Sequence, residues 1–204
     1  GAYRAQDGYD VERGGGRVNG SKSYAFQSQL RFRPTDNIDL WVSGDYQKDD
    51  NRTGYTDPVA DFGSGVIYRG AANDGNGFDR VVPRRNDLNR ETREVWGVAG
   101  HIDLDFNAVK VSSITAYRSI DSLFNRDGDN TQFNIITGVQ PVTYHQFSQE
   151  LRLLSPTGGT FEWQVGGYYF KDQRRSSDAN AIGPDFILTV NPGLAAFAPP
   201  LVPG

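Results

Sequence analysis

Residues 30–40 read Leu30-Arg31-Phe32-Arg33-Pro34-Thr35-Asp36-Asn37-Ile38-Asp39-Leu40, two alternating stretches on either side of a short polar segment. Pro, Asp and Asn favour turns because they fix or tolerate the backbone angles that a chain reversal needs. Successive strand side chains point to opposite faces, so alternation of apolar and polar residues around a turn predicts a β-hairpin. We therefore expect two antiparallel strands, near 22–33 and 37–48.

The same unit occurs twice more along the chain. Strands are expected near 92–106 and 108–120, joined at Asn107. A third pair is expected near 143–155 and 161–170, joined by Pro156-Thr157-Gly158-Gly159. The sequence thus predicts about six long strands in three hairpins, with a further short strand before Tyr9.

Long polar connections separate these hairpins. We expect loops at 49–90, at 121–142 and beyond 171. Short turns at one end and long loops at the other are typical of an outer-membrane β-barrel. Strands of roughly 10–12 residues suit a tilted bilayer crossing, whereas globular strands average about 5–6. The predicted fold is all-β, an antiparallel up-and-down meander belonging to a large transmembrane barrel, with its short turns on the periplasmic side.

Each predicted strand has one apolar and one polar face. In the first, Tyr24, Phe26, Leu30 and Phe32 share the apolar face. Strand alternation alone assigns a set of charged residues to the barrel lumen, where they would line the route or contact an enclosed domain: Arg31, Arg33, Asp45, Glu150 and Arg152. The register of the strand at 108–120 stays open, since Val111 and Tyr117 favour one face while Ile114 and Ile120 favour the other.

Composition excludes several classes of protein. The 204 residues are 37% hydrophobic, with no apolar run long enough for a membrane-spanning helix, and this leaves membrane strands possible. The chain has no Cys, which excludes disulfides and thiol catalysis. Its net charge of -4 gives no electrostatic case for a nucleic-acid partner. Because Met is also absent, we expect a processed product or a fragment.

No motif predicts a catalytic, cofactor-binding or metal-binding residue, and the ligand-binding residues stay unknown. Asp127, Asp129 and Asn130 resemble the start of a calcium loop. Gln132 and Gly138 stand where such a loop needs Gly and Glu, so we interpret the segment as a polar loop.

The remaining titratable clusters also favour structural interpretations. His101 and His145 lack a second His at metal-ligand spacing. Asp103 and Asp105 resemble a carboxylate pair but are better interpreted as lumen charges. An arginine cluster around Arg84 could attract an anionic solute, although neighbouring carboxylates neutralise it.

Two segments carry a resemblance to a known family. Residues 148–155, Ser-Gln-Glu-Leu-Arg-Leu-Leu-Ser, precede Trp163 and the run Gly166-Gly167-Tyr168-Tyr169-Phe170. This hairpin, together with residues 30–46, resembles the barrel of TonB-dependent outer-membrane receptors. The resemblance covers most of residues 1–175.

The resemblance implies a function and a set of partners. Such receptors import a scarce ligand, often a ferric siderophore, and also cobalamin or carbohydrates. They use energy delivered through TonB, and a plug domain of the same chain sits inside the barrel. Membrane lipid and lipopolysaccharide surround them in the bacterial outer membrane, and no enzymatic activity is implied. Residues 1–204 would then be an internal part of the barrel domain, without the plug and the C-terminal strands.

Physical limits indicate that this part is incomplete. About eight strands give a barrel just filled by its own side chains, so six cannot enclose a plug. We expect a curved open sheet that does not span a membrane by itself, because its edge groups would be unsatisfied in lipid. Two alternatives share some of these features. A passive porin-like channel has the same strand pattern, and a soluble lectin-like β-sandwich would form a closed two-layer fold.

Overall fold

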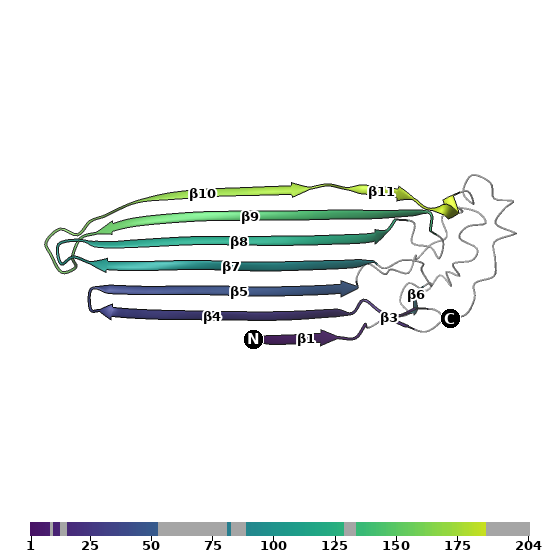
Figure 1. Ribbon diagram of the computed structural model, residues 1–204, viewed down its shortest axis with the longest axis horizontal. Helices are drawn as coiled ribbons and strands as arrows, with labels where there is room; N and C mark the ends of the chain where they lie inside the picture. The colour runs from purple at the N-terminus through teal and green to yellow at the C-terminus, as the bar shows by residue number, and fades with distance from the viewer. Residues whose placement is uncertain (9, 13–15, 53–80, 83–88, 129–133, 187–204) are drawn as a thin grey trace.

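The computed structural model describes residues 1–8, 10–12, 16–52, 81–82, 89–128 and 134–186. These form one large antiparallel sheet and one small sheet (Figure 1). The large sheet contains β1 (Ala2–Gln6), β4 (Ser21–Thr35), β5 (Ile38–Arg52), β7 (Arg90–Asp105), β8 (Lys110–Asp127), β9 (Ile136–Leu154), β10 (Gln164–Ser176) and β11 (Ala179–Ile182). The small sheet contains β2 (Asp10–Glu12), β3 (Gly16–Val18) and β6 (Val81–Val82), and a 3-10 helix spans Pro184–Phe186.

Strand order in the large sheet follows the chain: β1-β4-β5-β7-β8-β9-β10. Every neighbouring pair is antiparallel. The three short connections lie together at one end of the sheet, and the small sheet lies at the other (Figure 1). The predicted all-β meander of three long hairpins is confirmed, as is the short strand near the N-terminus. The sheet is open, with β1 and β10 at its edges.

The strands extend further than the sequence indicated. The predicted loop at 121–142 is wrong over most of its length, since β8 continues to Asp127 and β9 begins at Ile136. Polar residues such as Asn125 still pair across this ladder, because its hydrogen bonds are made by backbone groups. β5 continues to Arg52, so the loop expected from residue 49 is wrong at its start, and the strand expected from 161 begins at Gln164.

The loop expected beyond residue 171 is also wrong at its start. β10 continues to Ser176, and β11 pairs with β9 in the same register, as Ser176↔Val142 and Ala179↔Val139 show. Pro141 lies opposite the interruption between them. Its carbonyl still accepts a hydrogen bond from Ser177, but proline has no N–H to return one. β10 and β11 are thus one long strand interrupted by a missing donor.

Local chemistry explains the short turns. Asp36 and Asn37 connect Thr35 to Ile38, and the register shifts between Phe32 and Thr35, where Pro34 cannot donate to the ladder. Asn107 adopts a left-handed φ of 62°, and its N–H donates to Asp105 Oδ1 at 2.9 Å.

The third turn uses a glycine. Gly158 has a φ of 86°, and its N–H donates to Glu162 Oε1 at 2.6 Å. The backbone N–H of Ser155 donates to the Trp163 carbonyl, which extends the hairpin one pair beyond β10.

Little apolar surface is buried in this sheet. Among the described residues, Val18 and Ile135 are the buried hydrophobic side chains, while Leu30 is 75% exposed and Phe32 63%. A soluble two-layer sandwich would cover such residues between its sheets. The described strands form no second layer of that kind, so the sandwich alternative finds no support. No helix in the described part of the chain is both long and apolar enough to cross a membrane.

The turn at Asn107 gives a test of backbone strain. Asn107→Val should lower the free energy of unfolding by about 1–2 kcal/mol, because a β-branched residue is strained in the left-handed region. Asn107→Gly is the matched control and should keep the wild-type value. Urea unfolding of the full-length protein in lipid vesicles measures both. Equal losses in the two variants would mean that the Asn side chain matters, and not the angle.

Candidate functional site

The ladders assign each side chain of the large sheet to one of two faces. Directly paired residues lie on the same face. Phe26 pairs with Tyr46, Tyr46 with Trp96, and Trp96 with Ser119. We call the face that carries Phe26 and Trp96 the apolar face and the opposite one the polar face. Register also resolves β8, where Val111 and Tyr117 lie on the apolar face and Ile114 and Ile120 on the polar face.

Large hydrophobic side chains cover the apolar face and remain exposed. They come from all six long strands: Phe26, Leu30, Phe32, Val42, Tyr46, Trp96, Val98, Ile102, Leu123, Leu151, Val165 and Tyr169. On β4 the apolar stretch runs over residues 24–32 before Lys22 ends it. Nine strand residues cover about 30 Å along the strand. An exposed surface of this size and continuity indicates a non-aqueous environment.

The charged border of this face runs obliquely across the sheet. Its first charged residue is Lys22 on β4 and Lys171 on β10. On β5, β7 and β8 the first charges share one ladder row: Lys48, Glu94 and Asp121. Lys171 shares a ladder row with Ser28, which lies six residues from Lys22. A displacement of about 20 Å over five strand spacings, about 24 Å, inclines the border by roughly 40°. Barrel strands tilt by ≈ 35–45°, and the end-to-end inclination from β4 to β10 falls within that range.

A hydrogen-bonded cluster of three polar side chains lies on the apolar face of β8 and β9. Thr115 donates a hydrogen bond to Gln149 Oε1. Gln149 Nε2 donates to Ser113 Oγ at 3.0 Å and to the backbone carbonyl of Glu150 at 3.1 Å. The amide of Gln149 is therefore satisfied within the sheet. A buried or lipid-exposed polar group is costly mainly when unpaired, so this cluster is compatible with an apolar surrounding.

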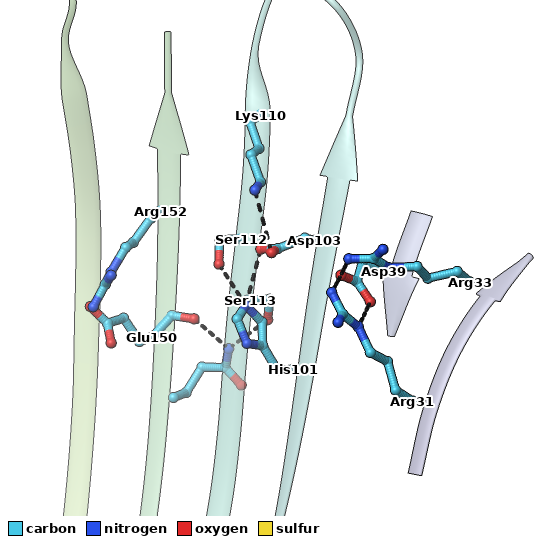
Figure 2. A network of polar contacts seen from close by, with 11 residues as sticks. Arg31, Arg33, Asp39, His101, Asp103, Lys110, Ser112, Ser113, Glu150 and Arg152 are labelled. Carbon is cyan, nitrogen blue, oxygen red and sulfur yellow. Dashed lines mark hydrogen bonds and ion pairs between the residues drawn. The ribbon is translucent and has the colours of Figure 1, made fainter. Parts of the chain in front are cut away.

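The polar face carries its charges in alternating columns near the short turns. Asp39 and Asp103 are direct cross-strand partners, and like charges in that position repel. Cations from the strands on either side neutralise them. On β4, Arg31 Nε donates to Asp39 Oδ1 at 2.8 Å and Arg33 Nη2 to Oδ2 at 2.9 Å. Lys110 on β8 pairs with Asp103 at 3.4 Å (Figure 2).

β9 carries a further ion pair on the polar face. Arg152 Nε donates to Glu150 Oε1 at 2.6 Å, on the polar face that alternation predicted for both residues (Figure 2). These two side chains pair with each other and lie on the β9 side of the cluster. The five charged residues assigned from the sequence are thus distributed over separate ion pairs and do not converge on one point.

One ion pair on this face crosses an entire strand. Arg118 Nη2 on β8 lies 2.7 Å from Asp45 Oδ1 on β5, and Gly97 of β7 lies between them in register. A Cβ at Gly97 would come within 3.1 Å of the guanidinium and 3.2 Å of the carboxylate. A side chain at position 97 would therefore crowd both members of the bridge.

A further carboxylate group organises the polar face near the long connections. Asp49 is 4% exposed and accepts hydrogen bonds from Arg93 and from Gln47 Nε2, and Ser23 also donates to it. Burial raises the pKa of Asp49, but these donors outweigh burial and hold its pKa below the usual value. The carboxylate stays ionised and fixes β4, β5 and β7 to one another.

His101, Asp103 and Ser112 superficially resemble a catalytic triad. Nε2 of His101 lies 3.0 Å from Asp103 Oδ1 and 3.0 Å from Ser112 Oγ. A triad requires the acid on one ring nitrogen and the nucleophile on the other, so that the proton can pass through the ring. Here one nitrogen serves both, and the imidazole instead lies against Trp41, with ring centroids 4.8 Å apart. The arrangement is suited to holding the strands together.

The structure also places the other candidate residues that were named from the sequence. His145 lies on the apolar face, and its Nδ1 is 3.2 Å from the Tyr117 hydroxyl and 3.1 Å from Ser119 Oγ. Asp105 supports the turn at Asn107 and is not part of a carboxylate pair. The described residues contain no group of three His, Cys, Asp or Glu side chains placed to hold a metal. Asp129, Asn130 and Arg84 lie outside the described residues.

Sequence reasoning missed Arg118 and Gly97. Arg118 lies on the strand whose register was open, so its face could not be assigned. Gly97 gave no signal by itself. Once β7 is aligned with β5, however, a glycine beside Asp45 on the polar face indicates that something crosses the strand there.

The bridge across β7 yields a matched pair of substitutions. Gly97→Val should lower the free energy of unfolding by about 1–3 kcal/mol through overpacking against Asp45 and Arg118. Gly100→Val on the same strand should cost little, because a Cβ there meets no atom within 4 Å. Urea unfolding of the full-length protein in lipid vesicles measures both.

A double-mutant cycle separates loss of the bridge from general strain. Adding Asp45→Asn should destabilise the wild type but have almost no further effect on Gly97→Val. Additive losses would contradict the bridge.

Comparison with known proteins gives a structural likeness. No family model matches the chain, and no curated protein matches its sequence. The fold is similar to the crystal structure of the ferric yersiniabactin uptake receptor FyuA from Yersinia pestis, with a TM-score of 0.63 and 12% sequence identity. The match covers 88% of this chain, and the chain spans 26% of the length of that receptor. The described sheet thus has the fold of part of a β-barrel receptor.

Proposed function

We propose that this chain is part of the barrel domain of an outer-membrane receptor that imports a scarce ligand, such as a ferric siderophore, with energy supplied through TonB. The observation that carries the proposal is the exposed apolar face, whose charged border is inclined as barrel strands are. The likeness to a ferric yersiniabactin uptake receptor supports the transport class. In this arrangement the apolar face contacts lipid in the bacterial outer membrane.

The polar face would then line the lumen. Its ion pairs run across neighbouring strands, and the exposed parts of Arg31, Arg33 and Arg152 remain available to an enclosed plug domain of the same chain. Residues 1–204 would be an internal portion of the barrel domain, closed by strands beyond it. The receptor binds and passes its ligand without bond chemistry.

Membrane embedding can be tested with neighbouring residues of β7. Val98 lies on the apolar face and Ala99 on the polar face. Val98→Arg should lower the free energy of unfolding in lipid vesicles by about 2–4 kcal/mol, because it places a charge near the bilayer midplane. Ala99→Arg should be tolerated in an aqueous lumen.

The measurement is urea unfolding of the full-length protein in vesicles, followed by the heat-modifiable shift of its folded band on gels. If both arginines cost the same amount, the two faces share one environment and the barrel assignment is wrong.

Energised transport distinguishes the receptor from a passive channel. Cells producing the full-length protein should take up a ferric siderophore, and uptake should stop when TonB is deleted or the proton gradient is collapsed. A passive porin-like channel would continue to pass small solutes under both treatments. Radiolabelled iron accumulation provides the readout, and a strain lacking the protein provides the baseline.

A further inference from the structure

A cavity of about 350 Å³ lies where β1, β4, β5 and β7 reach the end of the sheet away from the short turns. Gln6, Asp7 and Gly8 line it at the end of β1, and Gly20 and Ser21 line it at the start of β4. Its charged lining comprises four cations and two carboxylates: Arg17, Lys22, Arg52, Arg90, Asp7 and Asp50. The lining thus has a surplus of two positive charges.

The four cations of the cavity differ in their partners. Arg17 donates from Nη1 to the Gly8 carbonyl at 3.2 Å. Arg90 holds Asp50 through two hydrogen bonds of 2.7 Å, from Nε and Nη2. These hydrogen bonds hold the pKa of Asp50 below its usual value, and the charges of Lys22 and Arg52 lower it further. Among the described residues, Lys22 and Arg52 make no ion pair of their own.

The position of the cavity relative to the apolar face decides what can reach it. Lys22, Asp50 and Arg90 occupy apolar-face positions in the ladder. Lys22 comes directly after the last aromatic residue of that face on β4, Tyr24. If the apolar face contacts lipid, as proposed above, these cations lie at the level of the outer headgroups and outside the lumen.

We propose that this cavity binds the phosphate headgroup of an outer-leaflet lipid, with Lys22 and Arg52 as its principal ligands. A phosphomonoester carries about two negative charges at neutral pH, which matches the charge surplus of the lining. Guanidinium and ammonium groups are the usual partners of phosphate oxygens. The Arg90–Asp50 ion pair also lines the cavity and joins β5 to β7 there.

The chain provides a control of equal charge. Lys171 and Arg175 on β10 also occupy apolar-face positions and make no ion pair among the described residues. They line none of the described cavities. Removing these two cations therefore changes the charge at the headgroup level by the same amount but leaves the cavity intact.

The experiment compares unfolding temperatures of the full-length protein in neutral detergent micelles containing either phosphatidic acid or phosphatidylcholine. Phosphatidic acid should raise the unfolding temperature, because a ligand that binds the native state stabilises it. The double variant Lys22→Gln/Arg52→Gln should lose most of that shift. Lys171→Gln/Arg175→Gln should retain it, and so should the charge-conserving variant Lys22→Arg/Arg52→Lys.

Several results would overturn the proposal. An equal loss in both glutamine variants would indicate diffuse surface charge, and a shift reproduced by inorganic phosphate alone would indicate a free-anion site. The same unfolding temperature of wild type and Lys22→Gln/Arg52→Gln in phosphatidylcholine verifies that the variant folds. The inference rests on the proposed membrane embedding, yet the two fail separately: energised iron uptake can persist without the phosphatidic acid shift.

Discussion

Backbone pairing between neighbouring strands is the constraint on which the rest of this structure depends. Each ladder fixes which side chains share a face, because a strand repeats every two residues and a slip by one residue would exchange the faces. The ladders connect all six long strands, so the register of each strand is fixed relative to all the others. The separation into an apolar and a polar face is therefore a property of the whole sheet, and no single strand determines it.

The polar face shows how charge is arranged once register is fixed. Asp39 faces Asp103 directly, which would be unfavourable in an isolated pair of strands. Their neutralising cations come from β4 and β8, the strands outside that pair. The Asp45–Arg118 ion pair likewise joins strands that are not direct neighbours, since β7 lies between them and its Gly97 leaves room for the two side chains. Exposed pairs of this kind contribute little individually, so their main effect is to specify strand order and register.

The sequence was sufficient for the existence of the hairpins, their faces and the positions of the turns, because alternation and turn chemistry are local signals. It was insufficient for strand ends. Residues 121–127 look like a loop by composition, yet they pair along β8 because the ladder depends on backbone groups. It was also insufficient for contacts that need a partner strand. The partner of Arg118 can be identified only when β5, β7 and β8 are aligned. The cavity at Lys22 can be identified only when β1 is paired with β4.

A single sheet with this much exposed apolar surface has no reason to be stable in water. Its strands bury almost no hydrophobic side chain among the described residues, so the usual driving force for folding is missing. In lipid the apolar face would be solvated, but the free edges of β1 and β10 would leave backbone groups unpaired at a cost of several kcal/mol each. Both deficits disappear in one arrangement, a closed barrel to which this sheet contributes part of the wall. In the proposed arrangement, lipid would cover the apolar face and further strands would pair with the free edges.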